Sequence, residues 1–194
     1  MKYAERFGEC LFNATEEQLL EREPLMAFSF YLSGRVLVLC DMADEIVSNL
    51  DQGFSVEPAN GGVIGRADML MWFWLLGAYE VVRTMHQAKQ CFSERLAMDL
   101  QDLKKRLARA RMPAAKMEKP GRRAPVSSNR SPSGWDYNNR DLLVNDPEEL
   151  ATVSARGLLA HFDQVFSSIS RADVIGHHSA SCRDEQDHSA KAEE

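Results

Sequence analysis

The chain has 194 residues, of which 44% are apolar and 27% are charged, and its formal net charge is −6. This length supports one globular domain with a hydrophobic core, but not two domains of ordinary size. The composition excludes collagen-like and wholly disordered chains, and no apolar run approaches the roughly 18 residues of a membrane-spanning helix. We therefore expect one soluble domain over residues 1–175 and no membrane association.

The N-terminus and the cysteines indicate a cytoplasmic protein. The opening residues, MKYAERFGEC, lack the apolar core of a secretory signal peptide. The cysteines at positions 10, 40, 91 and 182 form no CxxC pair, which is typical of reduced thiols rather than of a disulfide framework. The histidines and the cysteine after residue 176 match no zinc pattern, so we expect no metal site and no cofactor.

Two helices are predicted in the first fifty residues. Thr15, followed three residues later by Gln18, forms a capping-box pattern that opens a short helix over 15–22. Apolar residues at steps of three and four then predict a long helix over 25–50. The following segment, 51–65, has four glycines and one proline and is typical of a loop.

A further long helix is predicted over 66–111, with a possible break near 91–93. Its MLMWFWLL stretch is apolar on every side and must be buried on most of them. Pro113 is expected to end this helix. Residues 112–145 contain four prolines and no sustained period, which predicts a long insertion that is ordered only in pieces, if at all.

The last helix has the strongest start signal in the chain. Asp146 is a favoured N-cap residue, Pro147 suits the first helical position, and two glutamates follow. We predict a helix over 146–171 and a disordered polar tail over 176–194. The fold class is therefore all-α, a bundle of about four principal helices with a long basic insertion before the last one.

Basic residues concentrate in one segment of an acidic chain. Residues 93–140 hold twelve Lys or Arg and five Asp or Glu, a net charge of +7 that leaves −13 for the remainder. Such a segment forms a solvated helix face, binds a nucleic acid or other polyanion, or contacts an acidic protein or a second copy. The residues predicted to bind nucleic acid are Lys104, Lys105, Arg109, Arg111, Lys116, Lys119, Arg122 and Arg123.

Aromatic residues add two expectations. Trp72, Phe73 and Trp74 lie on a helix that one small bundle leaves partly uncovered, and with the charge asymmetry they predict a homodimer. Trp135 and Tyr137 lie near basic groups, where they either stack on bases or anchor the insertion to the bundle.

Glu80 and Arg83 are three residues apart on a predicted helix whose preceding turns are nearly all apolar. They either pair with each other on the solvent face of the helix or form a polar pocket between helices.

Arg156 and His161 are separated by four residues on the last predicted helix. With this motif, the run of helices and the Glu80/Arg83 position, residues 15–171 resemble the HEPN superfamily of helical bundles. The resemblance implies metal-independent RNA cleavage in bacterial defence or a toxin–antitoxin system. His161 would then act as general acid or base, and Arg156 would hold the scissile phosphate. The alternative for His161 is a buried or interface histidine without catalysis.

Three function classes follow from these observations. The first is a ribonuclease of HEPN type. The second is a non-catalytic bundle whose basic insertion binds nucleic acid or an acidic protein partner. The third is a purely structural partner of an acidic subunit. The residues alone leave open whether the chain is an enzyme.

Overall fold

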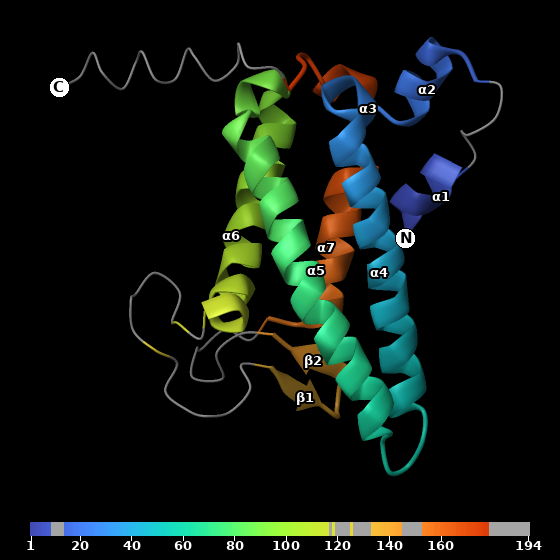
Figure 1. Cartoon of the computed structure of the whole chain (residues 1–194), viewed down its shortest axis with the longest axis vertical. Coiled ribbons are helices and arrows are strands. Elements are labelled where there is room, and N and C mark those ends of the chain that lie inside the picture. Colours follow the sequence, from blue (N-terminus) through green and yellow to red (C-terminus); the bar gives the residue numbers. More distant parts are fainter. Residues whose placement is uncertain (9–13, 117, 119–124, 126–132, 145–152, 179–194) are drawn as a thin grey trace.

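Four helices lie side by side and build the bundle: α4 (Phe30–Phe54), α5 (Gly61–Gln87), α6 (Glu94–Lys116) and α7 (Ala155–Ser167) (Figure 1). The computed structural model describes residues 1–8, 14–116, 118, 125, 133–144 and 153–178. The predicted all-α bundle of four principal helices is confirmed. The smaller elements are α1 (Lys2–Gly8), α2 (Glu16–Arg22), α3 (Leu25–Phe28), η1 (Lys89–Cys91), β1 (Gly134–Asp136), β2 (Asp141–Leu143) and η2 (Arg171–Asp173).

Polar side chains start these helices by accepting hydrogen bonds from the first free backbone N–H groups. Thr15 and Gln18 form the predicted capping box of α2. Ser29 accepts from the backbone N–H of Leu32 and starts α4, so the predicted helix over 25–50 is divided at this residue into α3 and α4. Asn60 caps α5 in the same way.

The predicted helix over 66–111 differs from the structure at its start and at its end. The predicted loop over 51–65 is too long, because α4 continues to Phe54 and α5 begins at Gly61, where Asn60 caps it. The break near residues 91–93 is confirmed, because α5 ends at Gln87 and α6 begins at Glu94. The predicted end at about residue 111 is wrong, since α6 continues through Pro113 to Lys116. Pro113 lies only three residues from the helix end, so few helical hydrogen bonds depend on it. The indole Nε1 of Trp72 also holds this last turn by donating to the carbonyl of Ala114 at 2.9 Å.

The predicted helix over 146–171 is shorter than expected. Its proposed start at Asp146 and Pro147 lies outside the described residues. Val153 and Ser154 are not helical: Val144 donates its N–H to the carbonyl of Val153 at 2.9 Å, and Ser154 caps α7. Pairing with the chain after β2 therefore replaces the helix here, and α7 runs only over Ala155–Ser167.

The described part of the predicted insertion includes a small antiparallel hairpin at one end of the bundle (Figure 1). Trp135 pairs with Leu142 across the two strands, and Leu142 is fully buried. The ring of Trp135 lies so close to Gly61 that an added Cβ there would be 3.1 Å from it. This contact favours the expectation that Trp135 anchors the returning chain to the bundle.

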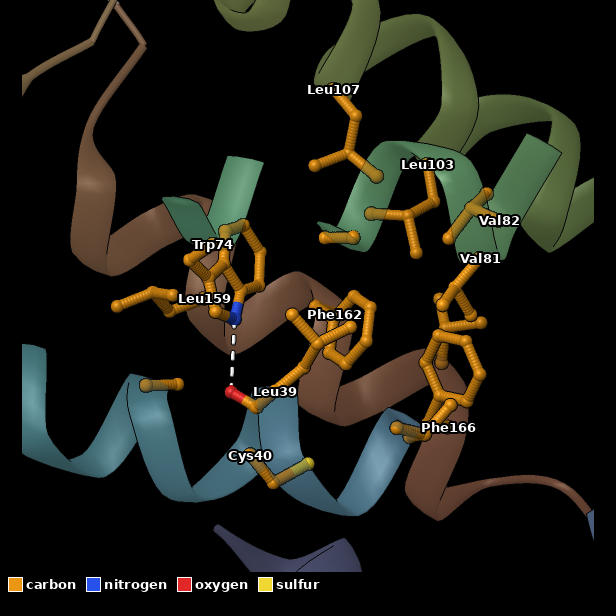
Figure 2. Close-up of a cluster of buried hydrophobic side chains, with 14 of the residues drawn as sticks. Leu39, Cys40, Trp74, Val81, Val82, Leu103, Leu107, Leu159, Phe162 and Phe166 are labelled. Atoms are coloured by element: carbon orange, nitrogen blue, oxygen red, sulfur yellow. Dashed lines mark hydrogen bonds between the residues drawn. The ribbon is translucent and has the colours of Figure 1, made fainter. Parts of the chain in front are cut away.

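The core is formed between all four helices of the bundle, with Leu103 and Leu107 of α6 in the same cluster as side chains of α4, α5 and α7 (Figure 2). Trp74 is fully buried, donates its indole N–H to the carbonyl of Leu39 at 3.0 Å, and meets Phe162 edge to face. Trp74 was expected on the uncovered face of the helix, and the structure corrects this. Trp72 and Phe73 are 40% and 50% exposed. Of the three aromatic residues on which the homodimer prediction was based, these two therefore lie on the surface.

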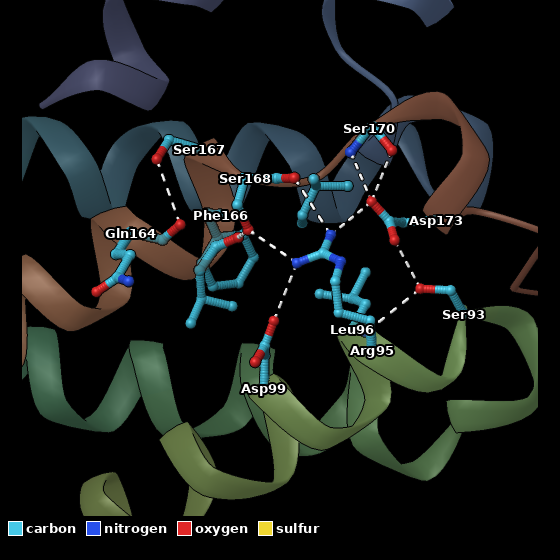
Figure 3. Close-up of polar contacts among 12 residues, drawn as sticks. Ser93, Arg95, Leu96, Asp99, Gln164, Phe166, Ser167, Ser168, Ser170 and Asp173 are labelled. Carbon is cyan, nitrogen blue, oxygen red and sulfur yellow. Dashed lines mark hydrogen bonds and ion pairs between the residues drawn. The ribbon is translucent and has the colours of Figure 1, made fainter.

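Arg95 joins the start of α6 to the segment that follows α7 (Figure 3). Its guanidinium contacts Asp173 at 2.6 Å and Asp99 at 3.0 Å, and it also donates to the backbone of Ser168. Asp173 accepts hydrogen bonds from Arg95 and from the hydroxyls of Ser93 and Ser170. Burial raises the pKa of Asp173, but these donors outweigh it and hold the pKa well below its usual range.

The beginning of the predicted disordered tail is docked on the bundle. Gly176 donates its N–H to the carbonyl of Cys91, and His178 donates to the carbonyl of Phe28 at 2.9 Å. Val174 forms a bridge with Phe92, which places the residues that follow along α3 and η1. Residues 176–178 are therefore ordered, and the rest of the predicted tail lies outside the described residues.

Candidate nucleic-acid interface

The C-terminal half of α6 carries only positive charge. From residue 104 to residue 116 the helix has six Lys or Arg and no Asp or Glu. At about 100° per residue, Lys105, Arg109 and Lys116 lie within about 40° of one another around the helix axis. All three are exposed, and we call them the outer row.

Lys104 and Arg111 point to the side of α6 that faces α5. Both are partly buried, and their contacts with α5 define the α5–α6 seam, formed by Tyr79, Glu80, Arg83 and His86 of α5 with Lys104 and Arg111 of α6. Three further residues predicted to bind nucleic acid lie outside the described residues: Lys119, Arg122 and Arg123.

Glu80 lies between two arginines of this seam. Its carboxylate accepts from Arg83 Nη1 at 2.9 Å, and the Nη2 of Arg111 is 3.5 Å from its other oxygen. Arg111 also stacks over the ring of Tyr79, 4.5 Å from the centroid. Glu80 and Arg83 are each about half exposed and pair with each other. The structure thus brings the polar pair of α5 and the basic residues of α6 into one seam.

His86 and Lys104 face each other across the seam. Lys104 Nζ is 3.0 Å from His86 Nδ1, and because an ammonium has no acceptor, this nitrogen of His86 carries no proton. Burial and the positive charges of Lys104 and Lys89 lower the pKa of His86. Burial, Arg83 and Lys105 likewise lower the pKa of Lys104.

His161 is held in a similar way on the other flank of α6. Arg106 Nη1 donates to His161 Nδ1 at 2.8 Å. Burial and then Arg106 lower the pKa of His161, against the opposing effect of Asp102 and Asp99. This imidazole is therefore neutral near pH 7, with its proton on Nε2.

Arg156, by contrast, is directed toward the hairpin end of the bundle. Its Nη2 is 2.7 Å from Asp51 Oδ1 at the end of α4, and its Nε donates to the carbonyl of Arg140. Its backbone N–H donates to Asp141, whose carboxylate also accepts from the hydroxyl of Ser154. Arg156 and His161 thus contact different elements, in keeping with the about 140° that separates them around α7.

Two residues that contact predicted site residues, Arg106 and His86, were not identified from the sequence. Arg106 belongs to the basic run, but only the packing of α6 on α7 places it at His161. His86 lies three residues after Arg83. Because residues three apart lie on the same side of a helix, this spacing could have predicted that His86 is near Arg83.

An apolar groove lies between α4 and α5. It has a volume of about 500 Å³, and its lining includes Tyr31, Val38, Phe73 and Gly77. Among the predicted site residues that the structure describes, Glu80 alone is part of this lining.

No helix in the part of the chain that the structure describes is both long and apolar enough to cross a bilayer. No group of three or more His, Cys, Asp or Glu side chains among the described residues could hold a metal ion. Comparisons of the chain with protein-family models, with curated proteins and with solved structures gave no match.

Proposed function

We propose that this chain binds RNA through the C-terminal half of α6. The observation that carries the proposal is the uninterrupted positive charge of residues 104–116, with its outer row exposed along one side of the helix. Most of the affinity of proteins for nucleic acids comes from cations that neutralise backbone phosphates.

The spacing of the outer row suits a linear polyanion. At 1.5 Å rise per residue, Lys105 and Arg109 are about 6 Å apart along the axis, and Lys116 is about 10 Å further. All three cations can therefore contact phosphates along one strand, although not at equal intervals. RNA is preferred to an acidic protein as the ligand because of the resemblance to the HEPN superfamily.

Cleavage of the bound RNA is a second candidate function, and the contact between Arg106 and His161 favours it. Arg106 can donate to phosphate oxygens, and the N–H at Nε2 of His161 can donate a hydrogen bond to a leaving oxygen as negative charge develops on it. In this arrangement Arg106, rather than Arg156, is the cation beside the histidine.

RNA binding is tested with a triple variant of the outer row, Lys105→Gln, Arg109→Gln and Lys116→Gln. The matched control removes three exposed cations elsewhere, Lys2→Gln, Arg22→Gln and Arg35→Gln, so the net charge changes equally. For single strands, the slope of log K against log salt should fall by about 0.7 for each lost phosphate contact, or about 2 in total. Equal weakening in both triple variants, or no RNA binding by the wild type at low salt, would refute the proposal.

Cleavage is tested on the same RNA with EDTA present, because the resemblance implies a reaction without metal. We expect His161→Ala to lower cleavage by about 10²- to 10⁴-fold while binding is retained. Arg106→Gln and Arg156→Gln, compared side by side, identify which arginine supports the reaction. Binding without cleavage by the wild type would leave a non-catalytic RNA-binding bundle.

A further inference from the structure

We propose that His86 and Lys104 of the α5–α6 seam form a binding site for a single phosphomonoester group, the terminal phosphate of an RNA strand. The inference rests on the proposed function, because it names the part of the RNA that this site recognises. The outer row, in contrast, follows the phosphodiester backbone.

The contact between the two side chains leaves donor groups for an incoming anion. Lys104 gives one proton to His86 Nδ1 and has two more, while the N–H of His86 lies on Nε2. Both side chains are partly exposed. Solute can therefore reach them, while the partial burial strengthens their interaction with a charged ligand.

The charged groups around this pair come from both elements that build it. Arg83 lies on α5 one turn before His86, Lys89 lies in η1, and Lys105 follows Lys104 on α6. Each charged group that shifts the pKa of His86 or Lys104 is a cation. The nearest acid of the seam, Glu80, is already held by Arg83 and Arg111. The cluster therefore gains from an anion that neutralises several cations at one point.

A phosphomonoester fits this requirement better than a diester does. It carries a charge of about −1.5 to −2 at neutral pH and offers three terminal oxygens, whereas a diester carries one negative charge. The negative charge of an anion bound by Lys104 and His86 favours the protonated form of the neighbouring imidazole. Binding should therefore raise the pKa of His86.

The site is tested first with inorganic phosphate as the probe. The pKa of His86 is followed through its imidazole C–H signals by NMR, in phosphate and in chloride at equal ionic strength. We expect a saturable rise in this pKa that is absent in Lys104→Gln and retained in the control Lys2→Gln. A pKa unchanged by phosphate, or a rise of the same size in Lys104→Gln, would overturn the site. The signals of His161 show in the same spectra whether the variant is folded.

The RNA terminus is tested with two oligonucleotides of one sequence, with a 5′-phosphate or a 5′-hydroxyl. We expect the phosphorylated strand to bind about tenfold more tightly, and Lys104→Gln and His86→Gln to abolish this preference. Equal binding of both strands by the wild type would overturn the terminal assignment. If neither strand binds while phosphate still shifts His86, the proposed function fails and the seam is a site for free phosphate.

Discussion

The two glycines of α4 provide a test in which one substitution has opposite effects at two positions of one helix. An alanine Cβ at Gly34 would have no atom within 4 Å outside its own turns. A Cβ at Gly53 would lie 2.5 Å from Ile64 Cγ1 and 3.2 Å from the backbone nitrogen of Ile64. Ile64 is fully buried in the first turn of α5 and cannot move aside without shifting the helix start.

Both Gly34→Ala and Gly53→Ala improve helix propensity, but only Gly53→Ala creates a steric clash. Alanine stabilises the interior of a helix by about 0.5–1 kcal/mol relative to glycine. Overpacking a core contact costs about 1–3 kcal/mol, and this cost applies at Gly53 alone. Because the helix effect is common to both positions, the free energies of unfolding of the two variants should differ by about 1–3 kcal/mol. For a chain of this size the difference corresponds to about 2–12 °C in Tm.

The assay is thermal unfolding followed by circular dichroism at 222 nm, with the wild type in the same series. Gly34→Ala should melt slightly above the wild type and well above Gly53→Ala. If Gly53→Ala were as stable as Gly34→Ala, α4 and α5 could not approach as closely as the structure shows.

Two further predictions concern the network of Figure 3 and the core of Figure 2. Asp173→Asn should lower the free energy of unfolding by about 1–2 kcal/mol at pH 7, a value reduced because Arg95 is half exposed. The pKa of Asp173 is lowered in the folded state, so its contribution is present above about pH 4 and is lost as the pH falls below it. Urea unfolding of wild type and variant should accordingly converge at low pH, and a constant difference would contradict the assignment. Trp74→Ala should cost about 3–5 kcal/mol in the same measurement, whereas Phe73→Ala, on the exposed side of α5, should cost under about 1 kcal/mol.

Local signals in the sequence were sufficient to predict the fold class and most helices. The capping box of Thr15 and Gln18 acts within one turn, and an apolar stripe records which face of a helix is buried. The break between α5 and α6 was also predicted from local sequence, near residues 91–93. The end of α6 was not, because the contact between the indole of Trp72 and the carbonyl of Ala114 joins residues from two helices.

The candidate site was predictable in its charges and not in its contacts. The sequence alone shows that residues 104–116 are basic and that Arg156 and His161 are close along the chain. Only the packing of α6 against α5 and α7 decides that His86 meets Lys104 and that His161 meets Arg106, while Arg156 binds Asp51. The physical reason is that the sequence determines the direction in which each side chain points from its own helix axis. Which residue it meets in that direction depends on how the neighbouring helix packs.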